Sequence, residues 1–211
     1  MPPLLHSLEI ILHWLGAFAG LGTLAYSLYR MFLAQSRPAG YQTGGARQVL
    51  RAPYLLIATL LFVILGYLLW NPLPIVLTLT LQLIFTLLGA GIFLGSLALY
   101  LWGLRTLGKN FNASSGFGVR LQQSHQLVTS GPYAYIRHPM YVGVILAGWG
   151  GLLLYRTWTM LFFAVIMFGL IYRAHKEDQA LSSFFSPEWE QYKQNVPAWI
   201  PRSRILTRKD D

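Results

Sequence analysis

The sequence contains no cysteine and few charged residues. Without cysteine, the protein has no disulfide framework, no cysteine nucleophile and no thiolate metal site. Asp, Glu, Lys and Arg make up only 11% of the 211 residues, whereas a soluble domain carries about 25%. Conversely, 55% of the residues are hydrophobic and the mean hydropathy is +0.46. The composition therefore predicts an integral membrane protein.

Five apolar stretches are candidates for membrane-spanning helices. They cover residues 8–33, 54–70, 75–104, 141–154 and 158–172. A helix needs about 20 residues to cross a hydrocarbon core of about 30 Å. The third stretch must therefore tilt or protrude, and the last two need helical residues beyond their apolar parts. We expect an all-α membrane bundle of about five transmembrane helices that forms a single domain over residues 1–211.

The basic residues orient this five-span arrangement. Fifteen of the sixteen Lys and Arg residues fall on one side of it, and only Arg156 falls on the other. Because positive residues concentrate on the cytoplasmic side, we expect an exterior N-terminus and a cytoplasmic C-terminus in a bacterial inner membrane or an ER-type membrane. The first ten residues lack Lys and Arg, so no signal peptide is expected. The net charge of +9 then reflects topology and contact with anionic membrane lipids, and no nucleic-acid partner is expected.

Several motifs within the spans favour structural roles. The glycine-rich stretches 89–95 and 148–151 lie inside apolar spans, where small residues let helices approach closely, so they are not dinucleotide fingerprints. The five histidines form no His-Glu-x-x-His pattern, and no metal site is expected. Glu9 and His13 lie four residues apart near the outer end of the first span, where a structural role is favoured over a functional one.

The segment 125–143, which runs into the fourth span, is rich in residues that can bind a ligand. Pro139 suits the first turn of a helix, and His138, which precedes a proline, is biased towards an extended conformation. Arg137 and His138 then stand at a helix N-terminus, where an anion is favoured. With the tyrosines nearby, the segment can hold a small ligand with a carboxylate and a flat ring. The alternative is an interface anchor of Tyr and Arg.

A second polar segment follows the fifth span. Arg173 and Glu177 are four residues apart and share a face if the helix continues. One interpretation is a surface ion pair of little energetic value. In the other, Glu177 meets a cationic or hydroxyl-bearing ligand and Arg173 meets an acid. The pair alone does not decide between them.

Together, the residues from about Gly103 to Pro201 resemble the isoprenylcysteine carboxyl methyltransferase family, within the wider group that includes membrane phospholipid methyltransferases. The pattern is Leu-Val-Thr-Ser-Gly-x-Tyr-Ala-x-x-Arg-His-Pro-x-Tyr-x-Gly over residues 127–143, followed by Arg173, Glu177 and an aromatic tail. The first hundred residues match only in hydropathy. The acidic pair is Glu-Asp at 177–178 where the family has Glu-Glu, and residues 112–123 do not align, so one cofactor contact is unplaced.

The resemblance implies S-adenosylmethionine as the methyl donor, held in a cytosolic pocket built from the C-terminal half of the chain, in segments 105–140 and 173–201. It implies that a lipophilic or lipid-modified substrate enters from the membrane between helices. Arg173 matches the arginine associated with the methyl-accepting substrate. The cofactor contacts carry over to His125, Gln126, Leu127, Val128, Tyr133, His138, Pro139, Met140, Tyr141 and Glu177.

The function expected from this resemblance is carboxyl O-methylation of an isoprenylcysteine-like acceptor. A carboxylate is already a nucleophile at neutral pH, whereas an amine acceptor must first lose a proton. N-methylation of a phospholipid or another small lipid is the alternative within the group. Two further alternatives are a membrane NADPH-dependent reductase of the sterol type and a non-enzymatic membrane protein that retains the fold. The sequence specifies neither the acceptor nor the oligomeric state.

Overall fold

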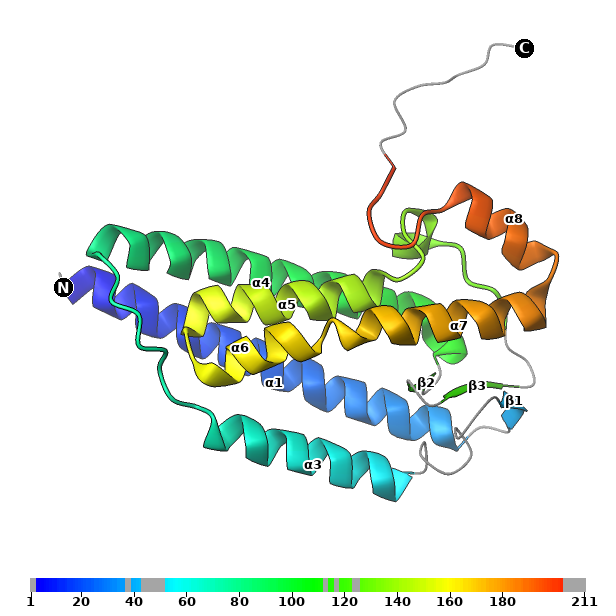
Figure 1. Cartoon of the computed structure of the whole chain (residues 1–211), viewed down its shortest axis with the longest axis horizontal. Helices are drawn as coiled ribbons and strands as arrows, with labels where there is room; N and C mark the ends of the chain where they lie inside the picture. The colour runs from blue at the N-terminus through cyan, green and yellow to red at the C-terminus, as the bar shows by residue number, and fades with distance from the viewer. Residues whose placement is uncertain are drawn as a thin grey trace, which may run out of the picture.

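The computed structural model describes residues 3–36, 39–42, 52–111, 114–115, 118–122 and 126–202, in which long helices run side by side along the longest axis (Figure 1). The helices are α1 (Pro3–Gln35), α3 (Ala52–Leu68), α4 (Leu79–Leu107), α5 (Pro139–Tyr155), α6 (Trp158–Ile166), α7 (Gly169–Phe185) and α8 (Glu188–Asn195). Two short 3-10 helices, η1 (Gly108–Asn110) and η2 (Gly131–Ala134), lie between α4 and α5.

Each of the five predicted spans corresponds to a helix or a helix pair. By length and composition, the segments Leu5–Ala34, Leu79–Asn110 and Trp158–Phe185 can cross a membrane, and α3 and α5 are shorter apolar helices. The helical membrane fold is thus confirmed, with two changes of boundary. Helix α4 begins at Leu79 and not at 75, because the Thr78 side chain accepts a hydrogen bond from the amide of Leu81 and caps the helix. The fifth span continues past residue 172 to Phe185, as α7.

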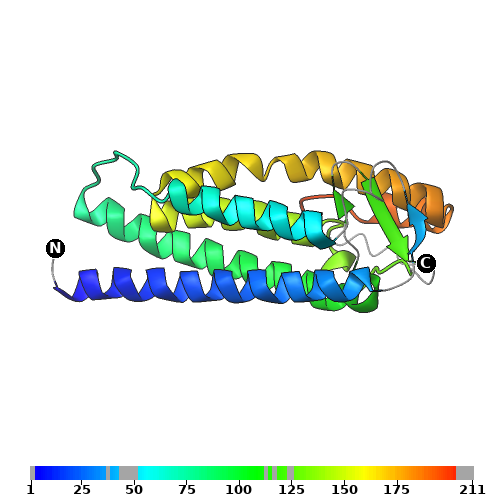
Figure 2. The same ribbon diagram turned by 90° about the horizontal axis from the view of Figure 1, so that it is seen from below.

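Three short strands accompany the helices, and the sequence did not predict them. β1 (Ala39–Gln42), β2 (Ser114–Ser115) and β3 (Gly118–Gln122) form an antiparallel sheet in the order β1-β3-β2. Strands of two to five residues are too short for a clear alternation of polar and apolar residues, so the sequence pattern did not reveal them. The sheet lies at the end of the bundle that α1 reaches with its C-terminus (Figure 2).

Glycines hold α4 and α5 against each other. A Cβ atom on Gly89 would lie 2.5 Å from the amide nitrogen of Leu154, and one on Gly150 would lie 2.5 Å from that of Phe93. Both distances are far below a normal contact, so the two helices meet backbone to backbone. The prediction that glycines serve helix packing is confirmed for Gly89 and for the stretch 148–151, whereas a Cβ atom on Gly91 or Gly95 would meet nothing within 4 Å.

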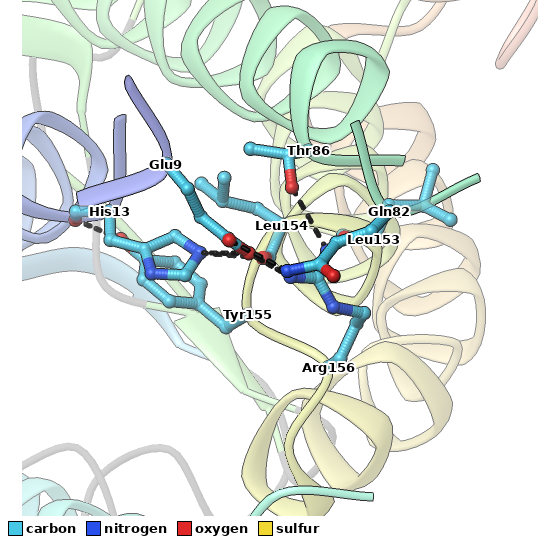
Figure 3. Close-up of polar contacts among 8 residues, drawn as sticks. All are labelled: Glu9, His13, Gln82, Thr86, Leu153, Leu154, Tyr155 and Arg156. Carbon is cyan, nitrogen blue, oxygen red and sulfur yellow. Dashed lines mark hydrogen bonds and ion pairs between the residues drawn. The ribbon is translucent and has the colours of Figure 1, made fainter. Parts of the chain in front are cut away.

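The start of α1 and the turn between α5 and α6 share one end of the bundle, here called the distal end, and α8 lies near the opposite end, here called the cavity end (Figure 1). At the distal end, Glu9 forms an ion pair with Arg156 (Figure 3). Gln82 donates to the second carboxylate oxygen at 2.7 Å, and Arg156 also donates to Thr86 at 3.1 Å. Arg156, the one basic residue on the opposite side of the five-span arrangement, is therefore neutralised within the bundle. The side chains of Glu9 and His13 lie 3.8 Å apart, and His13 Nε2 lies 3.0 Å from the carbonyl oxygen of Leu154.

Candidate functional site

At the cavity end of the bundle, most of the site residues predicted from the sequence line a single cavity. Its wall comes from the end of α4, the segment 126–128, η2, the start of α5, and one face each of α7 and α8. The predicted residues that line it are Gln126, Leu127, Val128, Tyr133, His138, Met140, Tyr141, Arg173 and Glu177. Pro139 is buried at the start of α5 beside them, and His125 lies outside the described residues. Segments far apart in sequence thus form one site.

The start of α5 has the local structure that its sequence predicts. Pro139 is the first residue of the helix and His138 is its N-cap. The amide of Arg137 donates to the carbonyl of Pro197 at 2.9 Å, and that of His138 donates to Ala198 at 3.2 Å. These bonds fix the segment after α8 across the entrance to α5. The segment after α8 therefore holds in place two residues that line the cavity, Arg137 and His138.

Asp178 holds the two residues before Pro139 from the side of α7. Its carboxylate accepts a bond from Arg137 Nη1 at 2.6 Å and lies 2.9 Å from His138 Nε2. Because a carboxylate only accepts, this contact places a proton on Nε2 of His138. In the sequence, Asp178 stands out only as a departure from the Glu-Glu pair of the family, and its position beside Glu177 is the one sign of a role in the site.

Tyr141 contacts two residues of α7, Glu177 and Arg173. Its hydroxyl donates to Glu177 Oε2 at 2.6 Å, and the guanidinium carbon of Arg173 lies 5.3 Å from its ring centroid. The His138 ring stacks on the Tyr141 ring at a centroid distance of 5.5 Å and an interplanar angle of 8°. Arg173 and Glu177 thus meet a shared aromatic side chain that lines the cavity.

Buried aromatic side chains form the part of the wall that α8 contributes. Trp189 is 2% exposed and lies under the Arg137 guanidinium at 5.7 Å, and Tyr192 donates to the carbonyl of Tyr133 at 2.7 Å. Burial raises the pKa of the Tyr133 phenol well above its ordinary value, and the negative charge of Glu177 acts in the same direction. The phenol is therefore a neutral hydrogen-bonding group. Trp189 was not selected from the sequence, because one aromatic residue in a polar helix carries no specific signal.

The short helix η1, which follows α4, supplies the side of the cavity next to the stretch that did not align. Asn110 of η1 and the next residue, Phe111, line the cavity, and Asn110 Oδ1 accepts a bond from the amide of Gln126 at 3.0 Å. This bond ties the segment 126–128 to η1. The two residues directly precede the stretch 112–123, in which one cofactor contact was left unplaced.

Comparison with known proteins confirms the resemblance found in the sequence. Residues 87–183 match the family model of the isoprenylcysteine carboxyl methyltransferase (ICMT) family. The matched segment contains α5, most of α4 and nearly all of α7, the helices that carry Tyr141, Arg173 and Glu177. The region that forms most of the cavity is therefore the region that resembles the family.

Individual relatives match over similar lengths. A protein-S-isoprenylcysteine O-methyltransferase from Schizosaccharomyces pombe is 41% identical over 81 residues, which are 37% of this chain and 34% of that protein. The nickel-cobalt-cadmium resistance protein NccN of Alcaligenes xylosoxydans xylosoxydans is 36% identical over 89 residues, 40% of each chain. A solved structure of the eukaryotic intramembrane Ras methyltransferase ICMT aligns with 25% identity and a TM-score of 0.48 over 72% of this chain and 53% of that one. The matches thus span between a third and two-fifths of the length of these two curated relatives.

Proposed function

We propose that the protein is an integral membrane methyltransferase that uses S-adenosylmethionine to methylate a lipophilic acceptor, most directly the carboxylate of an isoprenylcysteine-like molecule. The observation that carries the proposal is the convergence of His138, Tyr141, Arg173 and Glu177 on one cavity. These residues come from the segment that matches the methyltransferase family. No catalytic triad or metal is needed for this chemistry, because the cofactor brings its own leaving group.

The chemical groups around the cavity suit S-adenosylmethionine. The aromatic side chains of Tyr133 and Tyr141 offer faces for a flat ring, and the carboxylate of Glu177 is complementary to a cation. The N-terminus of α5, with Arg137 beside it, favours a carboxylate such as that of an amino acid. When bound, the cofactor supplies a methyl group on a positively charged sulfonium, which is already activated for transfer.

The task left to the protein is to orient the acceptor and to exclude water. Arg173 lies one helical turn before Glu177 on α7, towards the apolar part of the helix. In this position its guanidinium is suited to hold an acceptor carboxylate in line with the methyl group, and alignment of this kind accounts for much of the rate. A carboxylate acceptor needs no base. The tail that is bonded to Arg137 and His138 helps to shield the reaction from water.

We further propose that the cavity lies at the cytoplasmic face of the membrane. Fifteen of the sixteen basic residues fall on that side of the five-span arrangement. The acceptor then approaches from the bilayer and the cofactor from the cytosol. A reporter fused after the last residue is expected in the cytoplasm, and an exterior signal would contradict this orientation.

Two measurements test the function. Calorimetry on the purified protein is expected to show binding of S-adenosylmethionine. Binding of NADPH without binding of S-adenosylmethionine would instead identify a reductase. Incubation of membranes with S-adenosylmethionine labelled at the methyl group, followed by identification of the labelled product, is expected to reveal a methyl ester on a lipophilic acid. A labelled N-methyl lipid would retain the enzyme class but reject the carboxylate acceptor.

A further inference from the structure

Two buried N–H groups in the wall of the cavity have no hydrogen-bond acceptor. They are Nε of Arg137 and Nε1 of Trp189, and no other buried side-chain nitrogen or oxygen in the described part of the chain lacks a partner. Both residues line the cavity. Because buried donors are nearly always paired in folded proteins, two unpaired ones in one site need an explanation. A ligand of the cavity that supplies the acceptor is the direct one.

The two side chains are neighbours, and the contacts that hold them do not use these N–H groups. The guanidinium carbon of Arg137 lies 5.7 Å from the centroid of the Trp189 ring. Arg137 Nη1 donates to Asp178 at 2.6 Å, and the Trp189 ring packs on that of Tyr192 at a centroid distance of 5.6 Å. The wall therefore places Arg137 and Trp189 together, each with one N–H group that no described protein atom accepts.

The chemistry of these groups defines the missing partner. An indole and a guanidinium can only donate, so the partner must be an acceptor. An anion is favoured because Arg137 is positively charged and lies beside the N-terminus of α5. Asp178 offsets part of the Arg137 charge, so the two N–H groups and the helix N-terminus provide the specific attraction. A carboxylate has two oxygens and can accept from both donors.

We propose that Trp189 Nε1 and Arg137 Nε bind the carboxylate at the amino-acid end of S-adenosylmethionine. This inference rests on the proposed methyltransferase function and deepens it, because it assigns one end of the cofactor to two named donors. Trp189 belongs to α8, outside the residues 87–183 that match the family, so the match does not imply this role. Helix α8 then contributes a cofactor contact as well as a wall of the cavity.

The contact requires the cavity to widen when the ligand enters. Its free volume is about 100 Å³, whereas sites for small molecules measure about 300–1,000 Å³. Trp189 comes from α8 and Arg137 from the start of α5, and a ligand that parts these segments exposes the two covered N–H groups. Each N–H group then gains the acceptor that it lacks in the protein alone.

The test compares S-adenosylmethionine with its decarboxylated form, which lacks only the carboxylate. Calorimetry on the purified protein measures both affinities, and their ratio is the readout. The unchanged protein is expected to bind the decarboxylated form at least about tenfold more weakly, because hydrogen bonds to a charged group are lost. Trp189→Phe keeps an aromatic ring but removes the N–H group, and it should weaken S-adenosylmethionine about tenfold while the decarboxylated form changes little. Trp158→Phe, the same change at an exposed position on α6, is the control.

The outcomes separate the inference from its premise. If the unchanged protein binds neither probe, the proposed function fails. If it binds both probes equally well, the cofactor is bound but its carboxylate is not recognised, and the inference is wrong. Equal losses for both probes in Trp189→Phe would show that Trp189 only shapes the wall. Should Trp189→Phe fold poorly in thermal unfolding, Arg137→Lys gives an independent test, because it keeps the charge but removes Nε and must also lower the ratio; an unchanged ratio would overturn the inference.

Discussion

Glu9 and Arg156 form an ion pair that bridges 147 residues of sequence and ties the first helix to the turn between α5 and α6 (Figure 3). The side chains are only 12% and 18% exposed, and each has a second partner, Gln82 for the carboxylate and Thr86 for the guanidinium. A charge in this position is stable because it is paired and hydrogen-bonded. The pair therefore fixes α1 against the packed helices α4 and α5 at the distal end.

Removal of the Glu9 charge should be costly. Glu9→Gln is expected to lower the free energy of unfolding by about 3 kcal/mol, because Arg156 keeps a buried charge without a counterion. The double variant with leucine at both positions is expected to lose much less than the sum of the single changes. Thermal unfolding in detergent measures both. Lys193→Gln, which breaks an exposed pair with 4.0 Å between the charged atoms, is the control and should cost about 0.5 kcal/mol or less. Strictly additive losses at 9 and 156 would show that the two residues act separately.

The bond between Tyr141 and Glu177 should contribute to cofactor affinity. Tyr141→Phe keeps the ring beside Arg173 and His138 but removes the donor to the carboxylate. A hydrogen bond to a charged group contributes about 1.5–3 kcal/mol, so the affinity for S-adenosylmethionine should fall by roughly ten- to a hundredfold. Glu177→Gln should weaken binding at least as much. Calorimetry measures both, and Tyr135→Phe, an exposed position, is the control. Unchanged affinity in Glu177→Gln would remove Glu177 from the cofactor site.

The sequence was sufficient to predict the elements whose signals are local. Five apolar stretches gave the spans, and the order His138-Pro139 gave the start of α5 because proline restricts both itself and the preceding residue. The spacing of Arg173 and Glu177 predicted that the two side chains share a helix face if the helix continues. Helix α7 does continue past both residues, although its polar residues had marked the end of the predicted membrane span.

Contacts between distant segments were not predictable in this way. Asp178 acquires its role only because Arg137 and His138, 41 and 40 residues away, are brought to it. Arg30 similarly meets the end of α4 at a separation of 78 residues. Neither the packing of α7 on the start of α5 nor that of α1 on α4 leaves a pattern within one segment.

Arg173 should affect methyl transfer more than cofactor binding. The residue lies one turn before Glu177, towards the membrane, and is suited to orient an acceptor. Arg173→Ala is expected to reduce turnover by at least about a hundredfold while the dissociation constant of S-adenosylmethionine changes less than about fivefold. Turnover assays and calorimetry on the same preparation test this. Loss of cofactor binding with normal turnover of the cofactor that does bind would reverse the roles of Arg173 and Glu177.

The buried tyrosines of the cavity should make the fold sensitive to alkali. Burial raises the pKa of Tyr192 and that of Tyr133. Below about pH 10 both phenols are neutral in the folded and the unfolded chain, so their contribution to stability is fully present. Above it, the unfolded chain loses these protons first, and each tyrosine lowers stability by about 1.4 kcal/mol per pH unit until its folded pKa is reached. Tyr192→Phe should therefore show a shallower loss of stability above about pH 10 than the unchanged protein. An identical slope in chemical unfolding at several pH values would contradict the neutral, buried state of Tyr192.

Asp178 should act on the cofactor through its two partners. Its carboxylate binds Arg137 and His138 at the same time, and these side chains are only 10% and 6% exposed. Asp178→Asn offers a single acceptor oxygen, so one of the two partners loses its bond in a site that water barely reaches. We expect a loss of about 2–4 kcal/mol in stability and a more than tenfold loss of affinity for S-adenosylmethionine. Asp178→Glu keeps both oxygens and recreates the acidic pair typical of the family, and it should restore most of the affinity. Calorimetry and thermal unfolding on the three proteins decide the matter. If Asp178→Asn is less stable but binds the cofactor normally, Asp178 holds α7 to the start of α5 without positioning the residues of the cavity.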